Sequence, residues 1–246
     1  MCCQVSTTAH TPEESLEMLK LAAASGTTDL VASPHANAEF PFDEHRVHEA
    51  IRDLSRQSAG IINVHYGCDF HLNLQNLQDA LLNPSRYTIN HGPYLLVELP
   101  DFLGLSAARQ QLQALLDARI YPIITHPERN LSLQSARERL KEWVGDGCLV
   151  QVTAQSFLGR FGSTSSRIAE SLMNAGLVHF IASDAHDCAD RPPNLAEAYE
   201  HVSDRWGKPR AEAMFTNNPD AAISGEPVVR RFKESRRWLR PFSLWR

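Results

Sequence analysis

Short apolar segments alternate with amphipathic segments of helical period along most of the chain, and this alternation restricts the fold more than any other feature. The expected strands cover residues 30–32, 61–66, 94–98, 120–126, 149–152 and 178–184. Strands that alternate with helices pair into a parallel sheet. These segments are apolar on both faces, which is typical of strands covered by helices on both sides. About six such strands suit a β/α barrel better than an open sheet.

A short motif marks the start of the first helix. Thr11-Pro12-Glu13-Glu14 combines a capping box with proline at the first helical position. Leu16, Leu19 and Ala23 follow on one face, and Gly26 ends the helix. Further helices are expected over residues 43–58, 106–118 and 165–175.

Composition limits the classes of partner. The 246 residues carry a net charge of −5, and this acidic balance gives no electrostatic footprint for nucleic acid. No apolar run reaches the roughly 18 residues that a membrane span needs. The cysteines are scattered without a C-x-x-C pair, and the first residues do not resemble a secretory signal, so we expect reduced thiols and a cytoplasmic location. The cysteines are Cys2, Cys3, Cys68, Cys148 and Cys188.

The chain is expected to form one large β/α domain. We expect a divergent N-terminus over residues 1–10, the barrel over 11–227 and a basic, aromatic tail over 228–246. The tail is interpreted as a surface helix over the barrel, with a membrane or partner contact as the less favoured alternative.

Histidines and carboxylates follow the expected strands at their carboxyl ends. In a β/α barrel these ends meet at one mouth, where active sites are found. Imidazole and carboxylate ligands together suit zinc, manganese or iron. The candidate metal ligands are His35, Asp69, Glu98, His126, Asp184 and His186. A single histidine or glutamate at a strand end is more often a satisfied polar residue, but the recurrence at successive strands favours a metal centre.

Two arginines extend the candidate site. Arg129 and Arg191 each lie a few residues beyond an expected ligand. A guanidinium group binds two phosphate oxygens at once and offsets charge that develops during hydrolysis, so both residues are candidate catalytic groups. The alternative is surface ion pairing. None of the cysteines is followed at the sixth position by arginine, which excludes a cysteine-based tyrosine phosphatase, and no P-loop or Gly-x-Ser-x-Gly motif is present.

Several motifs, taken in order, resemble the polymerase-and-histidinol-phosphatase (PHP) superfamily. Within it, they are most similar to the bacterial tyrosine-protein phosphatases of capsular and exopolysaccharide biosynthesis. The resemblance covers roughly residues 11–227 and is carried by Thr11-Pro12-Glu13-Glu14-Ser15-Leu16, Ala32-Ser33-Pro34-His35, Ile124-Thr125-His126-Pro127-Glu128-Arg129, Gln151-Val152-Thr153-Ala154, Phe161-Gly162, Ile181-Ala182-Ser183-Asp184-Ala185-His186, Arg191-Pro192-Pro193 and Phe215-Thr216-Asn217-Asn218-Pro219.

The resemblance implies a distorted (β/α)7 barrel with three divalent ions, manganese foremost and iron or zinc as alternatives. It implies these ligand groups: Glu98 with His126, Asp184, His35 with His186, and Asp69 as a bridge. Arg129 and Arg191 are implied to bind phosphate, while His71 has no implied role. The implied substrate is the phosphotyrosine tail of a membrane-associated autokinase that controls polysaccharide export.

The chain departs from the family pattern at its beginning. Family members start with a strand that carries His-x-His, whereas residues 2–9 contain neither histidine nor an acidic residue. We therefore expect the first barrel strand to be missing or degenerate, three ligands to be absent and metal affinity to be weakened. An exposed barrel edge also makes an oligomer possible. Two alternatives follow: a metal-poor pseudoenzyme that binds the kinase tail, and a small-molecule phosphatase such as a histidinol-phosphatase. A nuclease is disfavoured by the acidic charge.

Overall fold

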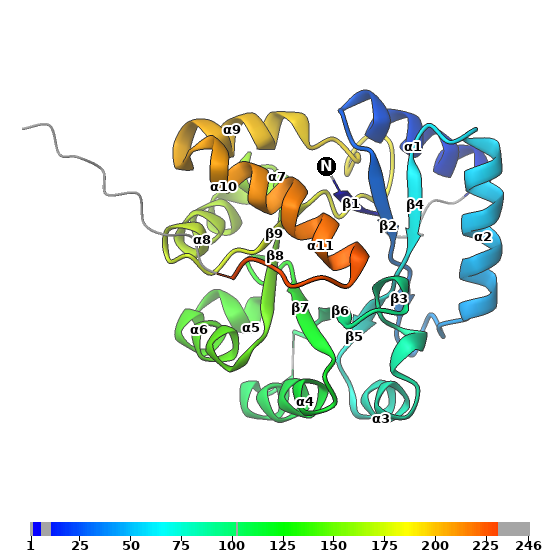
Figure 1. Cartoon of the computed structure of the whole chain (residues 1–246). Coiled ribbons are helices and arrows are strands. Elements are labelled where there is room, and N and C mark those ends of the chain that lie inside the picture. The colour runs from blue at the N-terminus through cyan, green and yellow to red at the C-terminus, as the bar shows by residue number, and fades with distance from the viewer. Residues whose placement is uncertain (1, 6–10, 102, 231–246) are drawn as a thin grey trace, which may run out of the picture.

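The computed structural model describes residues 2–5, 11–101 and 103–230, and their strands form two parallel sheets (Figure 1). One sheet has the order β1-β2-β4, and the other has the order β3-β5-β6-β7-β8-β9. The strands are β1 (Cys2–Val5), β2 (Asp29–Ala32), β3 (His35–Ala36), β4 (Asn63–Tyr66), β5 (Asp69–His71), β6 (Tyr94–Glu98), β7 (Tyr121–Thr125), β8 (Leu149–Thr153) and β9 (Phe180–Ala182). Every pairing is parallel, as the alternation of strands and helices predicts.

Two of the barrel positions are filled by interrupted strands. Ser33 and Pro34 separate β2 from β3, and Gly67 and Cys68 separate β4 from β5. The amide of Asp69 donates to the Pro34 carbonyl (2.9 Å), so hydrogen bonding continues across both interruptions. The nine strands therefore occupy seven successive positions. β1 lies against β9, but among the described residues these two strands form no ladder, so the ring stays open at this seam.

The first strand was expected to be missing or degenerate, and the expectation that it is missing is wrong. Residues Cys2–Val5 form β1, and β1 pairs in parallel with β2, with Val5 opposite Ala32. The run from Cys2 to Val5 supplies enough extended backbone for four ladder partners, although it contains no histidine. A strand is specified here by its neighbour in the sheet, which periodicity within so short a segment cannot reveal.

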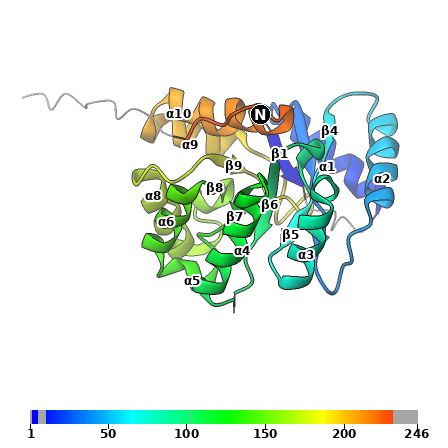
Figure 2. The same ribbon diagram turned by 60° about the horizontal axis from the view of Figure 1, so that its bottom comes forward.

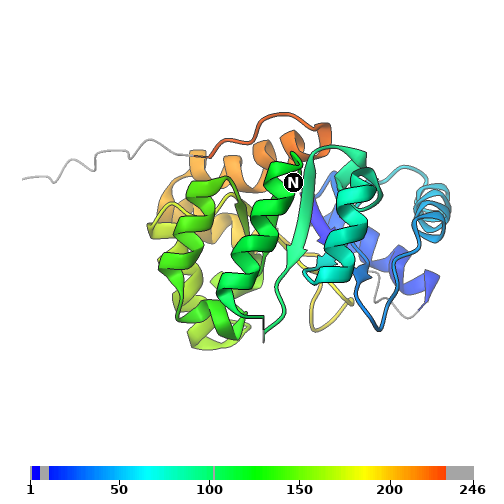
Figure 3. The ribbon, with the colours of Figure 1, turned by 90° about the horizontal axis from the view of Figure 1, so that it is seen from below.

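Helices cover the outside of the sheets, as Figures 1 and 3 show. They are α1 (Pro12–Ala24), α2 (Glu44–Gln57), α3 (Leu74–Leu82), α4 (Leu105–Asp117), α5 (Leu131–Gln134), α6 (Arg137–Asp146), α7 (Ala154–Phe157), α8 (Gly162–Asn174), α9 (Ala196–Trp206), α10 (Lys208–Glu212) and α11 (Asn218–Ser224). Two 3-10 turns, η1 (Pro84–Arg86) and η2 (Ile89–His91), and a π-helix, η3 (Ala213–Asn217), complete the described helical segments. The first helix begins as expected, because Thr11 Oγ1 accepts the Glu14 amide (3.1 Å).

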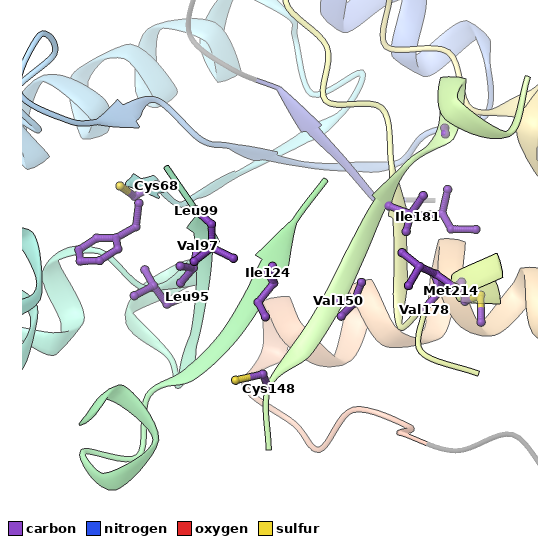
Figure 4. Packing of buried hydrophobic residues seen from close by; sticks show 14 of the residues in the cluster. Cys68, Leu95, Val97, Leu99, Ile124, Cys148, Val150, Val178, Ile181 and Met214 are labelled. Carbon is purple, nitrogen blue, oxygen red and sulfur yellow. The ribbon is translucent and has the colours of Figure 1, made fainter. Parts of the chain in front are cut away.

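Both faces of the central strands are buried. Leu95, Val97, Ile124, Val150 and Ile181 belong to one large apolar cluster, and Figure 4 shows them on neighbouring strands. The alternate residues Leu96 and Ile123 belong to a second, smaller cluster. A strand whose successive side chains are all buried has no polar face, which explains why these segments are continuously apolar in the sequence.

The C-terminal helices close one end of the strands. Figure 2 shows α9, α10 and the segment that follows them lying across the molecule beside the strands. Tyr94, at the start of β6, donates from its hydroxyl to the Glu226 carbonyl (2.8 Å), and Asn218 in α11 donates to the His179 carbonyl (2.8 Å). The amino ends of the strands are therefore covered, whereas the mouth at the carboxyl ends carries partly exposed side chains such as His35 and Glu98.

The described part of the tail packs on the barrel, since Val228 is buried and its amide donates to the Tyr94 hydroxyl (3.3 Å). Residues 231–246, on which the expectation of a surface helix rests, lie outside the described residues, and the domain boundaries stay a prediction. Within the described ranges, no helix combines the length and apolar character that crossing a membrane requires.

Candidate metal and phosphate site

The predicted ligands lie at or just beyond the carboxyl ends of β2, β4, β6, β7 and β9. His35 begins β3, Asp69 begins β5 and Glu98 ends β6, while His126 directly follows β7. His126 has a φ of 35°, and Asp184, two residues after β9, has a φ of 50°. Non-glycine residues avoid this left-handed region, and such backbone strain gathers at functional sites because the surrounding structure enforces it.

Three of these side chains form a compact group. One ligand atom from each of His35, Asp69 and Glu98 lies within 4.8 Å of the others. The Nδ1 atom of His35 is 3.0 Å from Asp69 Oδ2 and 3.8 Å from Glu98 Oε2. Parallel pairing explains the meeting, because His35 lies opposite Asp69 in the β3–β5 ladder.

Two further histidines surround the carboxylate of Glu98. His126 Nε2 lies 3.7 Å from Glu98 Oε1, and His71 Nδ1 lies 3.5 Å from Glu98 Oε2. His71, for which the sequence implied no role, thus contacts a predicted ligand. His71 is also opposite Glu98 in the β5–β6 ladder. Its side chain remains about one-third exposed, which keeps it within reach of solvent at the mouth.

The electrostatics of this group fit a cation. Burial raises the pKa of Asp69, even though the contact with His35 opposes the shift. Burial also opposes ionisation of Glu98, but His71, His126 and His35 together hold its pKa below the ordinary value. Among the described residues, the buried Oδ1 atom of Asp69 has no hydrogen-bond partner. A buried, unsatisfied carboxylate oxygen beside imidazoles is costly unless a cation or proton compensates it, so the donor set suits a divalent metal.

A second group is built around Asp184. Its Oδ2 atom accepts hydrogen bonds from both Arg129 and Arg191, so one carboxylate holds two guanidinium groups. Burial would raise the pKa of Asp184, but His126, Arg191 and Arg129 lower it below the ordinary value. Asp184 also acts electrostatically on His35, although it is not one of the three grouped residues His35, Asp69 and Glu98.

An aromatic ring supports both arginines. The guanidinium carbon of Arg129 lies 4.3 Å from the centroid of the Phe161 ring, and that of Arg191 lies 5.7 Å away. Phe161 directly precedes α8, and its ring is partly exposed. The ring adds a second contact to each guanidinium group, beside the hydrogen bond to Asp184. A cation over an aromatic face is stabilised by the ring quadrupole. The Phe161-Gly162 motif contributes to the family resemblance in the sequence, but it does not predict that Phe161 contacts arginine.

The loop after β9 positions His186 and Arg191. Asp187 accepts the amides of Ala189, Asp190 and Arg191 through Oδ1, which folds the loop tightly. The amide of His186 donates to the Arg191 carbonyl (3.0 Å). The His186 ring then lies 6.1 Å from the ring of His35, which brings it near the group of His35, Asp69 and Glu98.

Glu128 is a functional candidate that the pattern of strand ends misses. It is fully buried, and its Oε1 atom accepts the Thr153 amide (3.0 Å) and the Ser156 hydroxyl (2.7 Å). Burial raises the pKa of this carboxyl group. The interaction ties the loop between His126 and Arg129 to the end of β8. Its position inside the motif from Ile124 to Arg129 is the sequence signal that could have identified it.

Comparison with known proteins identifies a family and several relatives of this chain. The sequence model of a family described as "Capsular polysaccharide synthesis, CpsB/CapC" matches residues 1–224. CapC of Staphylococcus aureus is 32% identical over 191 residues, which are 76% of this chain and 74% of that protein. The tyrosine-protein phosphatase CpsB of Streptococcus pneumoniae is 26% identical over 225 residues, covering 88% of this chain and 92% of the relative.

A solved structure extends the likeness to three dimensions. A crystal structure from a study of YwqE from Bacillus subtilis and CpsB from Streptococcus pneumoniae, described as metal-dependent tyrosine phosphatases, superimposes with a TM-score of 0.86. It is 25% identical and covers 94% of this chain and 97% of the solved chain. The α/β architecture and the resemblance found in the sequence are confirmed by these matches. The chain belongs to the CpsB/CapC family of capsular polysaccharide synthesis.

Proposed function

We propose that this protein is a metal-dependent protein-tyrosine phosphatase that hydrolyses phosphotyrosine on an autokinase of capsular or exopolysaccharide synthesis. One observation carries the proposal: two guanidinium groups converge on Asp184 beside the His35, Asp69 and Glu98 group. A phosphate binder next to a cation-binding cluster is the arrangement that phosphomonoester hydrolysis requires. The names of the similar CpsB and YwqE proteins support the same activity.

The proposed metal ligands are the six residues that the sequence singled out, His35, Asp69, Glu98, His126, Asp184 and His186. Manganese is the proposed metal, because carboxylates and imidazoles predominate and no thiolate is proposed among the ligands. When bound, a divalent cation would neutralise phosphate oxygens and lower the pKa of water. His71 is added as a candidate ligand or positioning residue through its contact with Glu98.

Arg129 and Arg191 have the proposed task of binding and orienting the phosphate. Each guanidinium side chain is about a quarter exposed, so an incoming phosphate can reach it. Asp184 and Phe161 hold both groups in place before substrate arrives. Preorganised positive charge lowers the energy of the transition state without a rearrangement during the reaction.

The proposed partner is the phosphotyrosine tail of a bacterial tyrosine autokinase, and the proposed location is the cytoplasm. The partial exposure of Arg129 and Arg191 suits a flexible, phosphorylated segment that approaches from solvent. Cys68, Cys148 and Cys188 are free thiols, which agrees with a reducing compartment, whereas the side chains of Cys2 and Cys3 lie outside the described residues.

The test is hydrolysis of a phosphotyrosine peptide by the full chain, with and without added manganese. We expect metal-dependent release of phosphate that falls at least about a hundredfold in each of two variants. Asp69→Asn removes a proposed metal ligand, and Arg129→Ala removes positive charge aimed at the phosphate. His45→Ala is the matched control, because His45 is exposed on α2 and outside the site. Faster turnover of histidinol phosphate than of the peptide would instead favour a small-molecule phosphatase.

A second candidate function is binding of the phosphorylated tail without hydrolysis. The observation in its favour is that β1, whose place in the family carries His-x-His, contains no histidine. Tight binding of the phosphopeptide by folded protein, without phosphate release at any manganese concentration, would establish this role and contradict the proposed activity.

A further inference from the structure

A second group of metal-ligand side chains lies outside the proposed phosphatase site. One ligand atom from each of Glu44, His48 and His91 lies within 4.8 Å of the others. Glu44 and His48 are one turn apart on α2, which flanks β4 at the edge of the molecule (Figure 1), and His91 ends the η2 turn. This group shares no residue with the His35, Asp69 and Glu98 group. We call Glu44, His48 and His91 the outer cluster.

The proton on His91 is placed by a neighbouring carbonyl. His91 Nδ1 lies 2.8 Å from the Ser85 carbonyl oxygen, which can only accept a hydrogen bond, so Nδ1 carries the proton. Nε2 therefore holds the lone pair. A ligating histidine in a metal site is oriented in the same way, by a hydrogen bond from its other ring nitrogen.

A rigid aromatic surface holds both imidazoles. The His48 ring stacks on the Tyr66 ring with centroids 4.7 Å apart, and the His91 ring stacks on it with centroids 4.6 Å apart. Tyr66 is buried, and its hydroxyl donates to the Arg86 carbonyl, so this surface is fixed. The two imidazole rings lie 5.3 Å from each other. The two rings are therefore near enough to bind one cation together.

The backbone at His91 and at the residue before it is strained. Asn90 and His91 have φ values of 47° and 60° in succession. The Asn90 side chain accepts the Tyr66 amide (3.1 Å) and donates to the Ile223 carbonyl (3.1 Å), which holds the turn in this conformation. Two successive strained residues that are not glycine persist only when their surroundings enforce them.

We propose that Glu44, His48 and His91 form a second, surface-accessible site for a transition-metal ion, with zinc as the fitting ion. Two imidazoles and one carboxylate, with a position left for water, form a known type of tetrahedral zinc coordination. The ordinary alternative is a helical ion pair between His48 Nε2 and Glu44 Oε1, which are 3.9 Å apart. That pair does not account for His91, which joins the same group from outside α2. All three residues are at least partly exposed, so the ion can enter without opening the fold.

The experiment counts zinc bound by tag-free, metal-stripped full chain in equilibrium dialysis. The test variants are His48→Phe, which keeps a ring to stack on Tyr66, and His91→Asn, because asparagine tolerates positive φ. At a zinc concentration that saturates the wild type, each variant is expected to bind one zinc ion per chain fewer. Circular dichroism confirms that each variant is folded.

Two controls make the result specific. His45→Ala removes a neighbouring exposed histidine on α2 and is expected to retain the wild-type zinc number. Asp69→Asn alters the His35, Asp69 and Glu98 group and is expected to retain the ion at the outer cluster, whereas the double variant His48→Phe/Asp69→Asn is expected to lose it. Equal zinc numbers for wild type, His48→Phe and His91→Asn would overturn the proposal. This readout does not depend on phosphatase activity, so the two proposals fail separately.

Discussion

At the scale of single residues, the mouth combines carboxylates with arginines and histidines. The arginines must keep part of their positive charge available if they are to bind phosphate. Asp184 accepts hydrogen bonds from both arginines, and Glu98 receives contacts from three histidines. Burial makes each interaction stronger than it would be in water. The residue that keeps both arginines aligned without consuming their charge is Phe161, because an aromatic face attracts a cation without a net charge of its own.

Phe161→Leu is expected to weaken phosphate binding. Loss of two cation–π contacts, each contributing about 0.5–1 kcal/mol, lowers kcat/KM for a phosphotyrosine peptide about fivefold to thirtyfold. Phe161→Tyr keeps an aromatic face and should restore most of that loss, whereas unchanged kinetics in Phe161→Leu would show that the arginines are held by Asp184 alone. Steady-state kinetics on folded variants measure the difference.

At the scale of secondary-structure elements, the site depends on how loops are tied to strand ends. The loop after β7 carries His126 and Arg129, and Glu128 anchors that loop to Thr153 and Ser156 at the junction of β8 and α7. The sequence of β7 or β8 alone does not predict this anchoring, because the two hydrogen bonds join residues 25 and 28 positions apart. Helices α1, α2, α3 and α5, by contrast, begin at side-chain caps encoded within four residues.

Glu128→Ala is expected to lower the free energy of unfolding by about 2–4 kcal/mol, because it leaves the Thr153 amide and the Ser156 hydroxyl buried without their acceptor. Glu128→Gln keeps an acceptor oxygen and should lose much less. Urea unfolding of both variants is the measurement. A similar stability for Glu128→Ala and wild type would mean that the two donors find other partners.

Thr11→Ala is expected to destabilise the protein by about 1 kcal/mol, since the Glu14 amide loses the side-chain oxygen that caps α1. Thr11→Ser keeps a hydroxyl at the cap and serves as the control. Thermal unfolding of the two variants should separate them, with the serine variant close to wild type. Equal loss in both would assign the effect to the threonine methyl group.

At the scale of the whole molecule, the end of the barrel opposite the mouth is sealed by the C-terminal segment. His179, fully buried before β9, accepts the Val150 amide through Nδ1 (3.1 Å), and its backbone carbonyl accepts from Asn218 in α11. Burial, with a contribution from Arg230, lowers the pKa of His179 to about 4. This histidine must be neutral in the folded protein and becomes charged in the unfolded chain as the pH falls below about 6.5.

The stability of the protein should therefore depend on His179 in acid. Its contribution is fully present above the unfolded pKa of about 6.5, because neither state then binds the proton, and it is lost as the pH falls toward 4. Between pH 7.5 and pH 5 the loss is about 2 kcal/mol. His179→Asn keeps an acceptor near Nδ1 but does not titrate. Wild type should thus lose about 2 kcal/mol more than this variant in urea unfolding over that range, and parallel pH profiles would contradict the assignment.

Much of the fold and the candidate site can be predicted from the sequence because the signals are local. Caps such as Thr11 and continuously apolar strands such as β6 are properties of a few neighbouring residues, so the sequence predicts their elements at nearly the observed bounds. The alternation of strands and helices then brings all carboxyl ends to one mouth. For this reason the sequence by itself groups His35, Glu98 and His126, and their side chains do meet.

Tertiary structure alone decided what depends on contacts between distant segments. β1 exists because β2 offers it a ladder, and its four residues carry no periodic signal of their own. The pairing of Arg129 and Arg191 on Asp184, the contact of His71 with Glu98 and the meeting of His91 with α2 all require the ring of strands to be assembled. Local propensity specifies the elements, whereas the chemistry of both proposed sites arises from side chains that only the packing of those elements brings within bonding distance.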